Sequence, residues 1–108
     1  MPTSEGGLVS SMMKAIAKTY PEAWIFKTVG NPFQMSGVPD LLVCVNGRLV
    51  GIEAKFARPG ESHYHAAQRT TAGQDVQLMR INRAGGTAGV AVTVGEALAL
   101  IEKALNDT

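Results

Sequence analysis

The spacing of hydrophobic residues predicts a helix at each end of the chain. Ser4 is a candidate N-cap, apolar residues recur at steps of three and four from Leu8 to Ala17, and Pro21 ends the segment. Near the other end, a second stripe of this kind predicts a helix carrying Ala97, Leu98, Ile101, Ala104 and Leu105.

Runs of apolar residues between these helices predict strands. The first run carries Trp24, Ile25, Phe26 and Val29, and we expect Trp24 and Phe26 to lie in the core rather than form a base-stacking platform. After a loop from Gly30 to Gly37, the runs 41–45 and 48–52 are joined by Asn46-Gly47. This dipeptide is typical of a two-residue hairpin turn, because both turn residues need a positive φ.

The second half of the chain predicts one more helix and one more strand. Residues 57–70 are expected to form a long polar loop. Thr71 and Gln74 then have the spacing of a helix capping box, Gly85-Gly86 ends that helix, and 88–93 reads as a short buried strand. The order α-β-β-β-α-β-α predicts an α/β fold, a mixed sheet flanked by helices in one domain spanning 1–108.

Composition narrows the class of protein. The 108 residues are 45% hydrophobic, which is enough for one packed core and too much for a disordered chain. No apolar run approaches the ~20 residues of a membrane span, and the start of the chain lacks the pattern of a secretory signal. The single cysteine excludes an internal disulfide framework and a multi-cysteine zinc site. We therefore expect a soluble, cytoplasmic domain.

The charge balance is less decisive. The formal net charge is +1, which is not the strongly basic signature of many nucleic-acid-binding domains. The stretch from Arg48 to Arg83 is locally more positive, because its cations outnumber its acids. A solvated surface and a phosphate-binding surface explain this stretch equally well.

The hairpin register brings candidate catalytic groups together. If Asn46-Gly47 is the turn, Asp40 lies opposite Glu53, and Lys55 projects from the same face. Directly opposed carboxylates destabilise a sheet unless a divalent cation lies between them, and Mg²⁺ prefers such oxygen ligands. The structural alternative is that Asp40 caps the start of a strand while Glu53 and Lys55 are ordinary edge charges.

Three segments carry a resemblance to a known family. Gly37-Val38-Pro39-Asp40, Glu53-Ala54-Lys55, and Thr71-Ala72-Gly73-Gln74 before Gly85-Gly86 resemble the VRR-NUC family of PD-(D/E)xK nucleases, over nearly the whole chain. The resemblance implies a PD-(D/E)xK nuclease core and a metal-dependent DNA endonuclease. Asp40 and Glu53 would bind Mg²⁺ or Mn²⁺ together with the backbone carbonyl of Ala54, and Lys55 would position or activate the attacking water.

The resemblance extends to residues outside this motif. Gln74 matches the active-site glutamine of the family, and Glu5 matches a first-helix carboxylate that reaches the water shell of the metal. Apart from the resemblance, the histidines of the polar loop are usually solvated in such a position, or they contact phosphates or an unpaired base together with the loop arginines; the candidates are Arg58, His63, His65 and Arg69.

The resemblance also suggests a substrate and a partner. Stand-alone members resemble Holliday-junction resolvases and act as homodimers on branched DNA, in a bacterial or phage setting. No phosphate-loop pattern occurs in the sequence, so we expect no nucleotide cofactor. Two alternatives stay open: a non-catalytic DNA-binding module with the same fold, and a nuclease of duplex or single-stranded DNA.

Overall fold

The computed structural model describes residues 2–28 and 36–107. The described residues form one four-stranded sheet in the order β1-β2-β3-β4, in which β1 and β2 are antiparallel to their neighbours and β4 pairs parallel to β3. The strands are β1 (Trp24–Lys27), β2 (Leu41–Val45), β3 (Arg48–Ala54) and β4 (Thr87–Ala91). The helices are α1 (Glu5–Thr19), α2 (His63–Ala67), α3 (Ala72–Arg83) and α4 (Val94–Asn106).

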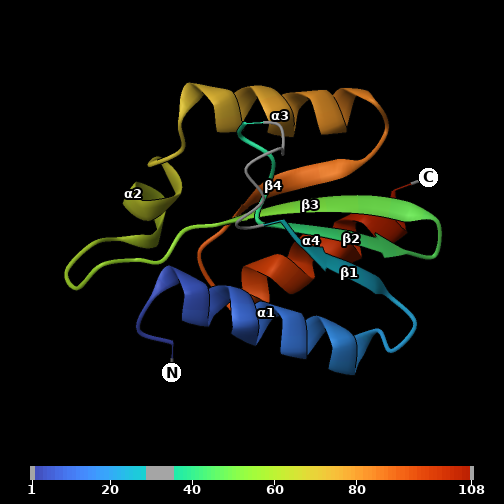
Figure 1. Cartoon of the computed structure of the whole chain (residues 1–108), viewed down its shortest axis with the longest axis horizontal. Coiled ribbons are helices and arrows are strands. Elements are labelled where there is room, and N and C mark those ends of the chain that lie inside the picture. The colour runs from blue at the N-terminus through green and yellow to red at the C-terminus, as the bar shows by residue number, and fades with distance from the viewer. Residues whose placement is uncertain (1, 29–35, 108) are drawn as a thin grey trace.

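The helices cover the two faces of the sheet unequally. Helices α1 and α4 lie on one face, and α3 lies alone on the other (Figure 1). The core sits between the sheet and the α1–α4 layer; its largest fully buried apolar side chains include Met12, Ile16, Leu41, Ile52 and Ile101. Helix α3 contributes no fully buried residue, and among the strands that the structure describes it packs closely only on β3 and β4. The helix therefore covers only part of the sheet face on which it lies. The predicted mixed sheet flanked by helices is confirmed.

The Asn46-Gly47 turn sets the register that the site depends on. Both residues have positive φ, 51° for Asn46 and 77° for Gly47, as the sequence predicted. The pairing runs from Val45 opposite Arg48 to Leu41 opposite Ile52. One step further along this ladder places Asp40 against Glu53.

Two expectations from the sequence are wrong. The centre of the 57–70 loop folds into the short helix α2, because the Ser62 side chain accepts a hydrogen bond from the His65 amide at 3.0 Å and Ala66 is buried. Trp24 and Phe26 are not core residues: they are 56% and 46% exposed. They lie on the edge strand β1, whereas α3 packs closely on β3 and β4. Val29 and the Gly30–Met35 part of the expected loop lie outside the described residues.

Within the described ranges, none of the helices has the length and apolar character that a membrane crossing requires.

Candidate active site

The backbone before β2 holds Asp40 in place. The Thr28 hydroxyl donates a hydrogen bond to the Pro39 carbonyl at 2.6 Å, and the Thr28 amide donates to the Asp40 carbonyl at 3.0 Å. Gly37 has a φ of +84°, and a Cβ there would lie 2.5 Å from the Gly73 carbonyl oxygen. Only glycine fits this close approach to the start of α3, so the segment leading to Asp40 is fixed from both sides.

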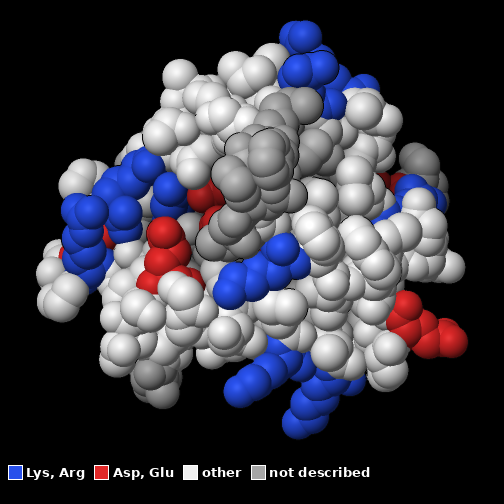
Figure 2. Space-filling view, viewed as in Figure 1, with Lys and Arg blue, Asp and Glu red and all other residues white. Residues whose placement is uncertain are grey.

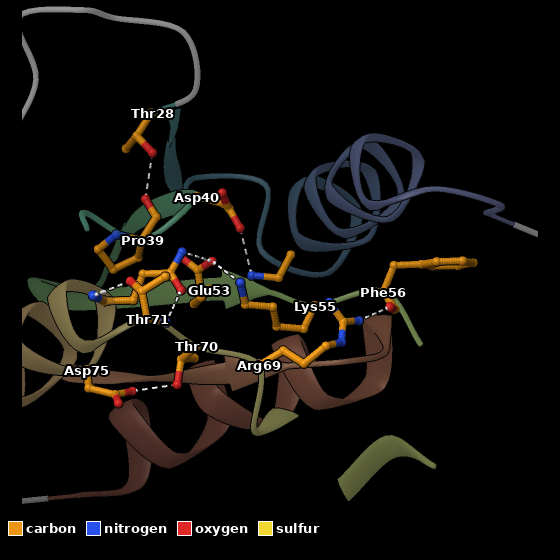
Figure 3. A network of polar contacts seen from close by, with 12 residues as sticks. Thr28, Pro39, Asp40, Glu53, Lys55, Phe56, Arg69, Thr70, Thr71 and Asp75 are labelled. Atoms are coloured by element: carbon orange, nitrogen blue, oxygen red, sulfur yellow. Dashed lines mark hydrogen bonds and ion pairs between the residues drawn. The ribbon is translucent and has the colours of Figure 1, made fainter. Parts of the chain in front are cut away.

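The side chain of Asp40 is fixed by the neighbouring strand. Its Oδ2 accepts a hydrogen bond from the Ala54 amide at 2.8 Å, which holds the half-buried carboxylate beside the end of β3 (Figure 3). The expected role of Ala54 concerns its carbonyl, and that role stays a prediction.

Glu53 and Lys55 form a buried ion pair at the end of β3. They are 2% and 7% exposed, and Lys55 Nζ lies 3.5 Å from Glu53 Oε2. The Gln74 side-chain amide donates a hydrogen bond to the same Oε2 at 2.9 Å (Figure 3). The other oxygen, Glu53 Oε1, is buried without a hydrogen-bond partner among the described residues. A buried carboxylate oxygen is normally satisfied, so this atom is the strongest sign that a ligand belongs here.

Gln74 serves two structures at once. The Gln74 side-chain Oε1 accepts a hydrogen bond from the Thr71 backbone amide at 3.0 Å. The Gln74 backbone amide donates to the Thr71 hydroxyl at 3.1 Å, and the two bonds complete the predicted capping box. The remaining Nε2 group of Gln74 points to Glu53. The start of α3 is thereby tied to the carboxylates on the sheet.

The electrostatics of the site favour a positive ligand. Burial, and next the charge of Asp40, raise the pKa of Glu53 to about 7, although Lys55 opposes the shift. Burial also raises the pKa of Asp40, against the lowering effect of the Ala54 amide, and the charge of Glu5 raises it further. Glu5 itself is exposed in the first turn of α1. Both carboxyl groups therefore resist ionisation in the metal-free site. A cation beside them would lower both pKa values and favour the ionised forms.

The donor set fits a small hard cation. Residues 2–28 and 36–107 contain no cluster of three His, Cys, Asp or Glu side chains of the kind that cages a metal. Asp40 and Glu53 offer carboxylate oxygens, one of them unpartnered, and Mg²⁺ is commonly bound by one or two carboxylates with waters completing its shell. The residues present therefore fit Mg²⁺ or Mn²⁺ rather than a histidine- or cysteine-bound metal.

The expected phosphate contacts in the 57–70 segment differ in availability. Arg69 is occupied: its guanidinium donates to Glu61 at 2.9 Å and also to the Phe56 carbonyl. These bonds connect the two ends of the 57–70 segment. No sequence pattern indicated Glu61 as a partner of Arg69. Arg58, His63 and His65 are exposed, and the His65 ring lies 3.6 Å from Glu61.

The raised pKa of Glu53 predicts how the stability of the metal-free protein depends on pH. Since the pKa is about 7 in the fold and 4.5 ordinarily, the folded state retains a proton that the unfolded state releases between these values. The free energy of unfolding should therefore fall as the pH rises through this window, and Asp40 acts in the same direction. Urea denaturation in EDTA at about pH 5 and about pH 8 measures this. Glu53→Gln should flatten the dependence; an unchanged slope in that variant would contradict the assignment.

Gln74 variants should separate helix capping from support of the carboxylate. Gln74→Ala loses the acceptor for the Thr71 amide and the donor to Glu53, so we expect a loss of about 1–2 kcal/mol in the free energy of unfolding. Gln74→Glu keeps the capping acceptor but faces Glu53 with a second carboxylate. It should keep the stability of the natural protein at about pH 5 and lose stability at about pH 8, where the two carboxylates repel each other; urea denaturation measures both. Equal stability of Gln74→Glu and the natural protein at both pH values would mean that Gln74 only caps α3.

Comparison with known proteins identifies the fold. No protein-family model matches the sequence, and no curated protein matches it either. Among solved structures, a VRR_NUC domain superposes with a TM-score of 0.63 at 21% sequence identity, covering 94% of this chain and 97% of that one. The chain therefore has the fold of a VRR_NUC domain over almost its whole length.

Proposed function

We propose that this protein is a metal-dependent endonuclease that hydrolyses phosphodiester bonds in DNA. The observation that carries the proposal is the buried, unpartnered Oε1 of Glu53, in a site where Asp40, Lys55 and Gln74 converge. The likeness to a solved VRR_NUC domain supports the same class of enzyme. Buried polar atoms in native folds are normally satisfied, and a buried ion pair is weak evidence for a purely stabilising role.

The residues of the site have distinct roles in this proposal. Asp40, Glu53 and the Ala54 carbonyl would hold Mg²⁺ or Mn²⁺, and the bound ion would polarise a phosphoryl oxygen and lower the pKa of a water. Lys55 places its ammonium beside Glu53, where it orients the attacking water or balances the negative charge that develops on the phosphate. Gln74 keeps the Glu53 carboxylate in one orientation. Glu5, on α1, adds negative charge that acts on Asp40, and the family resemblance would assign it to the water shell of the ion.

The finer parts of the proposal concern substrate, assembly and setting. We propose branched DNA as the preferred substrate and a homodimer as the active form, because two sites related by a two-fold axis suit paired cuts in a symmetric junction. Arg58, His63 and His65 are exposed and are available to contact phosphates. The expected setting is the cytoplasm of a bacterial or phage-infected cell.

A cleavage assay on a labelled four-way junction and on the matching linear duplex tests the proposal. Each substrate is incubated with Mg²⁺, Mn²⁺ or EDTA. Cuts that require metal and are confined to the junction would support the whole proposal, while metal-dependent cuts in both substrates would support the nuclease and reject its selectivity. No cleavage of either DNA would favour a non-catalytic DNA-binding module. Sedimentation that yields only monomer at micromolar concentration would reject the dimer.

A further inference from the structure

An exposed pair of aromatic rings lies on the same face of the sheet as the carboxylates. The strand registers align Trp24 with Cys44 and Leu49 in one row across the sheet, and Phe26 with Leu42 and Gly51 in the next. The following row contains Asp40 and Glu53. Because two residues along a strand span about 7 Å, Phe26 is one such step from the carboxylate row and Trp24 is two.

This part of the sheet is left uncovered by α3. The helix packs over β3 at Gly51, where a Cβ would lie 3.0 Å from the Ile81 side chain, and among the described strands it packs closely on β3 and β4 rather than on β1. Trp24, Phe26 and Leu49 are 56%, 46% and 41% exposed. The two rings stack on each other, with centroids 5.7 Å apart and planes within 4° of parallel. In Figure 2 the surface over β1 is largely uncharged and includes a cationic side chain.

Cationic side chains flank the aromatic surface. Arg48 and Arg80 line a pocket of about 470 Å³ together with Leu49, at the end of the row that starts at Trp24. Lys27, which follows Phe26 on β1, is exposed too, but it pairs with the core residue Leu41 and so belongs to the opposite face of the sheet. Aromatic rings for stacking beside cations for phosphates are the combination that binds single-stranded nucleic acid.

The exposed area favours a nucleobase over a second copy of this chain. An aromatic side chain presents about 150–250 Å², so the half-exposed rings of Trp24 and Phe26 offer roughly 100 Å² each. A stable protein dimer buries about 800 Å² on each partner. One or two bases match the smaller area.

We infer that Trp24 and Phe26 form a stacking platform for unpaired bases of the DNA strand that enters the site, with Arg80 contacting its phosphates. This inference rests on the proposed function, because it takes DNA as the ligand. It adds that the enzyme recognises single-stranded nucleotides next to the scissile bond, on the β1 side of Asp40.

The fluorescence of Trp24 provides a direct test, because it is the one tryptophan in the sequence. The folded protein is titrated in EDTA, which prevents metal-dependent cleavage, with a single-stranded oligothymidylate of about 12 nucleotides and with a blunt duplex. We expect the single strand to quench the emission and the duplex to leave it unchanged. Phe26→Leu should weaken single-strand binding about tenfold, whereas Phe26→Tyr should restore it. Met79→Ala, which trims a comparably exposed apolar side chain on α3, is the matched control.

Two results would overturn the inference. The first is binding of the oligonucleotide without quenching, or with equal affinity in Phe26→Leu. The second is a Phe26→Leu variant that sediments as a monomer where the natural protein is a dimer, with unchanged affinity for the oligonucleotide, since this would assign the surface to a second copy. Metal-dependent DNA cleavage by the natural protein without any quenching would reject the platform alone and leave the proposed function intact.

Discussion

Replacing Lys55 with alanine is expected to reduce the rate of DNA cleavage by about 10²- to 10³-fold, the loss typical of removing one group that stabilises transition-state charge. The Lys55 ammonium is 3.5 Å from Glu53 Oε2 and almost wholly buried, so water cannot replace it easily. Single-turnover cleavage of a labelled DNA in saturating Mg²⁺ measures the effect on the chemical step.

A second variant distinguishes loss of the ammonium group from loss of the folded structure. Lys55→Met keeps the packed stem of the side chain and removes only the ammonium, so it should be as inactive as Lys55→Ala. It should remain folded in EDTA at about pH 5, where Glu53 takes up a proton and no longer needs the counter-charge. Lys14→Ala, at an exposed position of α1, is the control for removing a lysine and should cleave normally. Full activity in Lys55→Met would reduce Lys55 to a structural counter-charge.

Asp40→Asn is expected to abolish Mg²⁺-dependent cleavage while stabilising the metal-free fold. Loss of a metal ligand should cost more than the roughly 10- to 100-fold that loss of an outer-shell partner costs. The asparagine side chain can still accept the hydrogen bond from the Ala54 amide, and it removes the negative charge that helps to raise the pKa of Glu53. Relief of up to about 1 kcal/mol of repulsion corresponds to a rise of roughly 4–8 °C in Tm for a domain of this size.

Thermal unfolding with and without Mg²⁺ checks both halves of this prediction. The natural protein should gain stability on addition of Mg²⁺ at about pH 8, because a ligand that binds only the folded state stabilises it, and the gain should vanish in Asp40→Asn. If Asp40→Asn unfolds at a lower temperature in EDTA, the carboxylate supports the strand start and the cation account of the site loses its basis.

The part of the site that could be predicted is the part fixed by local rules. Asn46-Gly47 specifies a two-residue turn, and the turn alone determines that Asp40 meets Glu53. The capping spacing of Thr71 and Gln74 likewise predicts where α3 begins. The hydrogen bond from Gln74 to Glu53 depends on how α3 lies over the sheet. The family resemblance assigned Gln74 to the active site without indicating this partner.

The two wrong predictions, the burial of β1 and the loop at 57–70, have the same physical cause: both depend on how elements pack against one another in the fold. Trp24 and Phe26 have the composition of a buried strand, but burial depends on whether a helix covers that face, and α3 packs closely on β3 and β4 rather than on β1. The contact of Arg69 with Glu61 spans a segment whose polar residues read as a loop, and this contact accompanies the short helix α2. Neither outcome is encoded in residue spacing alone.

Nicking of supercoiled plasmid DNA tests the central claim most directly, because it does not depend on the preferred shape of the substrate. The natural protein and Glu53→Gln are compared in Mg²⁺ and in EDTA. We expect nicked circles only from the natural protein in Mg²⁺, since Glu53→Gln retains the size of the side chain and removes the buried charge that would hold the cation. Equal nicking by Glu53→Gln, or nicking that persists in EDTA, would contradict a metal-dependent nuclease centred on Asp40 and Glu53.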